Sequence, residues 1–132
     1  MSGSPNRLLA TVFGVVYLLV GLAGFAVTGF SDFAGTKGDT LIVFDVNPLH
    51  NIVHLAIGAL LLAASRTVRS AKAANTAVGA VYLLVGVLGL FLIDSDANIL
   101  ALNGADNVLH FGSAVLLLGV GLGADKPSAV RA

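Results

Sequence analysis

Three histidines and one aspartate are the residues of this sequence best suited to chemistry. His50 and His54 are four positions apart, and so are Asp106 and His110. Because residues four apart share one face of a helix, each pair can present two ligands side by side. Three imidazoles and a carboxylate form a ligand set that suits zinc, iron or copper. The four residues are therefore a candidate transition-metal site.

Further polar residues on the same predicted helices define a wider candidate cofactor site. In a variant of the hypothesis, His54 and His110 are the two axial ligands of a haem, one from each half of the chain. Two alternatives stay open: the histidines are neutral and hydrogen-bond asparagine or tyrosine across helices, or they transfer protons. The candidate cofactor-binding residues are His54, His110, Asn51, Asn107, Tyr17 and Tyr82.

Motifs of other chemistries are missing from the sequence. There is no cysteine, which excludes disulfides, thiolate ligands and cysteine nucleophiles. There is no phosphate-binding loop, nucleophile elbow or HExxH motif. The formal net charge of zero gives no reason to expect nucleic acid as a partner. A hydrolytic enzyme is the least expected function, and the sequence leans away from an enzyme altogether.

The elements that must position these residues are membrane spans. Of the 132 residues, 57% are hydrophobic and 11% are charged, whereas soluble domains carry roughly 25% charged residues. A bilayer core needs about 17 to 25 helical residues. Four apolar segments meet this requirement, at 8–30, 48–64, 74–93 and 104–123. We expect an all-α, integral membrane four-helix bundle that forms a single domain over residues 1–132.

The distribution of charge predicts how this bundle is oriented. Basic residues cluster before the first segment, between the second and third, and after the fourth, with Lys37 as the exception. Cytoplasmic loops carry an excess of Lys and Arg, so we expect a multi-pass plasma-membrane protein with both termini cytoplasmic. The basic residues are Arg7, Arg66, Arg69, Lys72, Lys126 and Arg131, and the acidic residues of the opposite side are Asp32, Asp39, Asp45, Asp94, Asp96 and Asp106.

An internal repeat relates the two halves of the chain. Residues 12–25 resemble residues 77–90 at a shift of 65, which aligns Tyr17 with Tyr82. Asn47, Asn51 and His54 recur at a shift of 56 as Asn103, Asn107 and His110. We interpret this pattern as a tandem duplication of a two-helix unit, with repeats at about 8–65 and 74–123. Both units then enter the membrane with the same orientation.

The repeated residues also predict how the helices pack. Glycines and a tyrosine share one stripe of the first helix and of the third, and glycine lets helices approach closely in lipid. We predict that these stripes pack against the Asn/His stripes of the second and fourth helices, where a tyrosine–histidine hydrogen bond is possible. Asn47-Pro48 and Asn103-Gly104 are expected to begin those two helices, which gives Asp106 an alternative role in a capping box.

These features resemble an uncharacterised bacterial family, domain of unknown function 4383. The resemblance rests on the VYLLVG-type first segment and on the N-P-x-H-N-x-x-H pattern that begins at Asn47 and ends at His54. It covers nearly the whole chain. In architecture and size the chain is also similar to four-helix membrane proteins of the oxidoreductase-associated DoxX type. The family has no assigned activity, so the resemblance implies a fold and leaves the function open.

Three functions fit these observations. The first is a structural or accessory membrane component that self-associates or joins a larger membrane complex. The second is a haem- or metal-binding redox protein that uses His54 and His110. The third is a small transporter or channel, for which polar residues are few. The partners expected are the lipid bilayer and a second copy of the chain or other membrane proteins.

Overall fold

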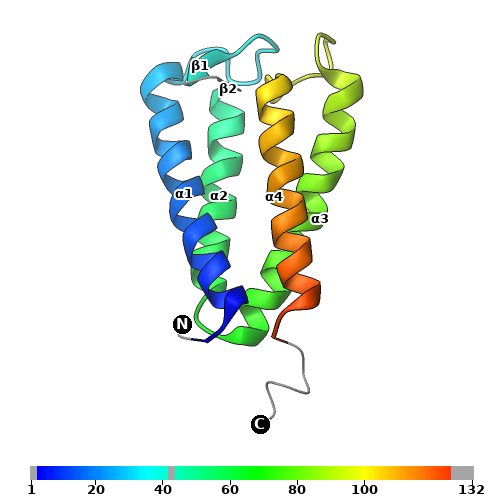
Figure 1. The fold of residues 1–132 in the computed structure, drawn as a ribbon. Helices are drawn as coiled ribbons and strands as arrows, with labels where there is room; N and C mark the ends of the chain where they lie inside the picture. Colours follow the sequence, from blue (N-terminus) through cyan, green and yellow to red (C-terminus); the bar gives the residue numbers. More distant parts are fainter. Residues whose placement is uncertain (1–2, 42–43, 126–132) are drawn as a thin grey trace.

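A computed structural model describes residues 3–41 and 44–125, which form four helices and a small hairpin. The elements, in chain order, are α1 (Pro5–Thr28), β1 (Asp39–Leu41), β2 (Phe44–Val46), α2 (Pro48–Ala64), α3 (Val68–Leu92) and α4 (Gly104–Gly123). The helices alternate in direction, and the hairpin and the α3–α4 loop lie together at one end (Figure 1). Lys126 and Arg131 lie outside the described residues.

The sequence predicted the four helices well. The bounds of α2 and α4 are confirmed, because Asn47 and Asn103 are N-caps that accept hydrogen bonds from the backbone N–H groups of His50 and Asp106. Asp106 also accepts from the backbone N–H of Asn103 at 2.9 Å, which completes the predicted capping box. In contrast, α1 and α3 begin earlier than predicted, because Ser4 and Thr67 cap them outside the apolar stretch.

The hairpin is an addition to the predicted all-α fold. Strands β1 and β2 pair antiparallel, with Thr40 opposite Asp45 and Leu41 opposite Phe44. Thr, Phe and Val favour strands, but strands of three residues give too weak a pattern to predict from sequence. The hairpin ends at Val46, and the next residue, Asn47, is the cap of α2. It therefore covers the end of the bundle at which α2 and α4 begin.

The distribution of residues is that of a protein in lipid. Helices α1, α3 and α4 are long and apolar enough to cross a membrane, and α2 is shorter at 17 residues, the lower limit for a span. Large apolar side chains such as Leu19 and Leu90 are about 60% exposed, whereas the histidines and all of the asparagines except Asn103 are buried. Polar residues inside and apolar residues outside agree with a membrane bundle.

The helices pack as two similar pairs, α1 with α2 and α3 with α4. Gly24 of α1 contacts Asn51 of α2, and Gly89 of α3 contacts Asn107 of α4. The other contacts follow the same pattern: Gly14 faces Leu62 and Gly21 faces Leu55, whereas Gly79 faces Leu118 and Gly86 faces Phe111. These partners are related by the shifts of 65 and 56 found in the sequence. The predicted packing of glycines against the asparagine stripes is confirmed.

Candidate metal centre

Three histidines meet inside the bundle near the end covered by the hairpin. His50 and His54 come from consecutive turns of α2, and His110 comes from α4. One ligand nitrogen from each ring can be chosen so that all three lie within 4.8 Å of one another. The ring centroids of His50 and His54 are 4.4 Å apart, and that of His110 is 5.9 Å from His50. Each side chain is only 2% exposed.

The histidine nitrogens have few protein partners. Both ring nitrogens of His50 and of His54, and Nδ1 of His110, make no hydrogen bond of normal geometry within the described part of the chain. The ring of His50 faces the backbone of Asp45 and Leu100. A buried polar group without a partner costs roughly 1–3 kcal/mol. Several such groups at one point make the three histidines the candidate site of this structure.

The arrangement can hold a metal ion. Zinc–nitrogen bonds of about 2.0–2.1 Å place tetrahedral ligand nitrogens about 3.3 Å apart. Nitrogens that already lie within 4.8 Å of one another reach this spacing through small side-chain movements. Three protein ligands leave one position open, which is the pattern of catalytic sites rather than structural ones.

Asp106, the fourth predicted ligand, is not part of this histidine group. Its Oδ2 accepts the hydrogen bond from Asn103, whereas its Oδ1 makes no hydrogen bond of normal geometry, although the carboxyl group faces the backbone of Asp45. The side chain is 1% exposed and lines an apolar cavity together with His54. The structure therefore brings together three of the four candidate ligands. The carboxyl group of Asp106 instead lines the neighbouring apolar cavity.

The two predicted tyrosines form a layer below the histidines. The ring of Tyr17 lies 5.1 Å from that of His54, the ring of Tyr82 stacks on His110 at 5.1 Å, and the tyrosines stack on each other at 5.3 Å. The suggested tyrosine–histidine hydrogen bond is not formed. The hydroxyl of Tyr17 instead hydrogen-bonds Ser113 at 2.6 Å, and that of Tyr82 has no partner of normal geometry.

Two asparagines and one serine complete the surroundings of the site. Asn51 is buried against α1, where it donates to Thr28 at 3.0 Å, and Asn107 is buried against α3. Their contacts therefore hold the helix pairs together. Sequence reasoning missed Ser113, the partner of Tyr17. At the shift of 56 it corresponds to Ile57, and this polar exception to the predicted repeat could have identified it.

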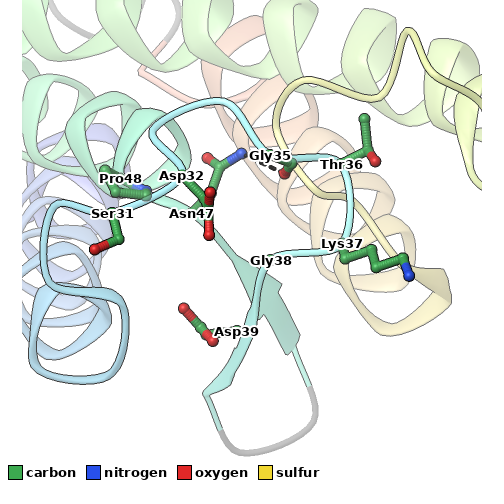
Figure 2. Close-up of a pocket in the computed structure, with 9 residues that line it drawn as sticks. All are labelled: Ser31, Asp32, Gly35, Thr36, Lys37, Gly38, Asp39, Asn47 and Pro48. Carbon is green, nitrogen blue, oxygen red and sulfur yellow. Dashed lines mark hydrogen bonds between the residues drawn. The ribbon is translucent and has the colours of Figure 1, made fainter.

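A polar cleft at the hairpin end lies above the start of α2. It has a volume of about 300 Å³, and its walls include Asp32, Lys37, Asp39 and Asn47 (Figure 2). Asn47 donates to the backbone oxygen of Gly35 at 3.0 Å and to that of Ile99 at 2.6 Å. The Asn47 side chain thus connects the loop that contains Gly35 to the α3–α4 loop, at the end of the bundle near the histidines.

The match to a known family includes all of these residues and the four helices, apart from the first two residues of α1. Residues 7–123 match the model of the family described as domain of unknown function (DUF4383). The chain belongs to the DUF4383 family. This finding confirms the resemblance predicted from the sequence, and the description of DUF4383 assigns no activity to its members. Neither a curated protein nor a solved structure is significantly similar to the chain.

Proposed function

We propose that this DUF4383 protein is a plasma-membrane metal-binding protein in which His50, His54 and His110 hold one transition-metal ion. The observation that carries the proposal is the meeting of three buried imidazoles, in which both ring nitrogens of His50 and His54 and Nδ1 of His110 lack a hydrogen bond of normal geometry. Imidazole suits zinc, copper, iron and nickel, and affinity peaks at copper in the divalent series. The position that the protein leaves open gives the ion capacity for redox or Lewis-acid chemistry.

The proposed orientation gives the ion a route from the non-cytoplasmic side. Arg7, Arg66, Arg69 and Lys72 lie near the end of the bundle opposite the hairpin, as the positive-inside rule requires of a cytoplasmic end. The hairpin end has one polar cleft with Asp32 and Asp39 and another with Asp45, Asp94 and Asp96, and in each the aspartates outnumber the one basic residue, Lys37. Acidic clefts attract cations. We attribute the similar helix pairs to duplication of a two-helix unit, after which only the first unit carries two histidines.

Haem binding is the less favoured version of this proposal. A bis-histidine haem needs the space between His54 and His110 for its macrocycle. The two ring centroids are 6.4 Å apart, but the ring of His50 lies 4.4 Å from one and 5.9 Å from the other. A macrocycle would have to displace His50, whereas a single ion uses it as a ligand.

Metal titration of the detergent-solubilised protein tests the proposal. Chelator-treated protein should bind about one equivalent of Co²⁺ with the visible spectrum of a four-coordinate site, and Zn²⁺ should displace it. His54→Ala and His110→Ala should each weaken binding by at least tenfold. The matched control is Asn75→Ala, a buried polar position at the opposite end of the bundle, which should retain binding. Equal cobalt binding by the histidine variants and wild type would refute the site, and a Soret band would establish haem instead.

An accessory role is the second candidate, supported by the outward face of α4. Gly112 and Gly119 are exposed, and a Cβ atom at either position would meet nothing within 4 Å. Small residues on a lipid-facing surface allow another helix to approach. The same purified sample separates the two candidates. A folded protein that binds no cobalt but runs as an oligomer would favour the accessory role.

A further inference from the structure

An apolar cavity separate from the histidine group lies between α1, α4 and the hairpin. Its volume is about 240 Å³. Valines and Phe13 of α1 form one wall, Leu109 of α4 forms another, and Phe44 and Val46 of the hairpin contribute a third. On its rim, Val12 and Val16 are each 46% exposed on the membrane-facing surface of α1. A molecule dissolved in the bilayer could enter between these side chains.

Two unpartnered polar side chains line this otherwise apolar cavity. His54 is 2% exposed and makes no hydrogen bond of normal geometry through either ring nitrogen. Asp106 is 1% exposed, and its Oδ1 makes no hydrogen bond of normal geometry, although the carboxyl group faces the backbone of Asp45. The remaining polar groups of the lining, the hydroxyls of Tyr17 and Ser113, already bond each other. Buried polar groups are rarely left without partners. His54 and Asp106 are therefore the positions at which a bound molecule would gain hydrogen bonds.

The cavity dimensions and chemistry select one class of ligand. A cavity of 150 Å³ holds benzene, so about 240 Å³ holds a single ring with one or two small substituents. The rings of Phe13, Tyr17 and Phe44 offer aromatic contacts. A carboxylate ligand would bring a second carboxyl group against Asp106, and burial of an ammonium group would cost a large desolvation free energy. A neutral hydroxyl meets neither obstacle and can donate to Asp106 or exchange a hydrogen bond with His54.

We infer that this cavity binds a phenol, that is, a small aromatic ring with a hydroxyl group, which reaches it from the bilayer. The ring occupies the space between α1 and α4, and the hydroxyl hydrogen-bonds Asp106 and His54. The inference does not rest on the proposed metal, because the cavity and both polar groups belong to the protein alone. If the metal is present, His54 connects the two sites, so a bound phenol would lie directly beside the metal centre.

Fluorine NMR with two matched probes tests the inference on chelator-treated protein in detergent. The probes are 4-fluorophenol and fluorobenzene, which differ by the hydroxyl group. We expect saturable binding of 4-fluorophenol, at least tenfold tighter than that of fluorobenzene after correction for partition into empty micelles. Equal affinity for the two probes, or a 4-fluorophenol signal identical to that in empty micelles, would overturn the inference without any variant.

Two variants on one helix locate the bound probe. Val16→Phe fills the rim of the cavity and should weaken 4-fluorophenol binding by at least tenfold. Val15→Phe adds the same volume at the neighbouring position, which is 43% exposed and does not line the cavity, and should leave binding unchanged. Equal binding by wild type and both variants would overturn the assignment to this cavity. Cobalt binding, measured separately, reports on the metal proposal independently.

Discussion

At the scale of single residues, the inside of this bundle is polar and incompletely hydrogen-bonded. Histidine nitrogens, the Tyr82 hydroxyl and one oxygen each of Asn107 and Asp106 are buried without partners. In lipid such groups are costly, because no water can replace the missing partner. Most of these groups lie around His54 and His110, although Asn51 and Asn75 also carry one unpartnered oxygen each. This concentration is the basis of the proposed binding site.

The two tyrosines provide a matched test of which polar groups stabilise the fold. Tyr17→Phe removes a buried hydrogen bond and leaves Ser113 without its partner, so we expect a loss of about 1 kcal/mol in the free energy of unfolding. Tyr82→Phe removes a hydroxyl that has no partner of normal geometry and should cost less. Unfolding of both variants by denaturant in mixed micelles measures the difference. A larger loss for Tyr82→Phe would contradict this assignment.

The helices could be predicted from sequence to the extent that local signals define them. Asn-Pro and Asn-Gly determine where α2 and α4 begin, so both bounds were correct. Helices α1 and α3 extend beyond the apolar stretches, because hydropathy reports the thickness of the bilayer and not the length of a helix. The spacing of His50 and His54 indicated a shared face. His110, and not Asp106, completes the histidine group because of how α4 is rotated against α2. No local sequence pattern encodes this rotation.

The close packing within each helix pair predicts a specific sensitivity to added methyl groups. A Cβ atom at Gly24 would overlap the side chain of Asn51, and one at Gly89 would overlap that of Asn107. Gly24→Ala and Gly89→Ala should each lower the free energy of unfolding by about 1–3 kcal/mol. Gly112→Ala is the matched control, since its Cβ would meet nothing within 4 Å. It should be neutral or stabilising by up to about 1 kcal/mol. Thermal unfolding in one detergent compares all three, and equal effects would refute the packing argument.

At the scale of the whole molecule, the two ends of the bundle differ in the residues they carry and in how their helices are connected. The hairpin end carries the acidic clefts and covers the histidines. The opposite end fastens the first and last helices together, because Asn6 of α1 donates to the backbone oxygen of Val120 at 3.1 Å and accepts from Asn75 of α3 at 3.0 Å. Lys72 donates to the backbone oxygen of Ala124 at 2.7 Å, a favourable interaction at the C-terminus of a helix. These hydrogen bonds close this end of the bundle and hold α1 beside α4. The apolar cavity lies between the same two helices, nearer the hairpin end.

Asp125 makes this closure dependent on pH. Its Oδ2 accepts hydrogen bonds from the Ser4 hydroxyl at 2.9 Å and from the backbone and side chain of Asn6 at 3.0 Å. Burial by itself raises the pKa of the Asp125 carboxyl. The hydrogen bonds from Asn6 and Ser4 and the charge of Lys72 outweigh it, so the folded pKa lies below the ordinary value.

The sign of the pH effect follows from this depressed pKa. The stabilisation from ionised Asp125 is complete above its unfolded pKa of about 3.9 and is lost as the pH falls through the lower folded pKa. We expect Asp125→Asn to melt at a lower temperature than wild type at pH 7, and the difference to disappear as the pH is lowered from about 4 to 2. Ser4→Ala removes one of the donors to Asp125. In the Ser4→Ala background, the difference in melting temperature caused by Asp125→Asn should therefore be smaller but not zero. Melting temperatures measured across this range in an acid-stable detergent provide the test, and a difference that is constant with pH would exclude Asp125 as the origin of the closure.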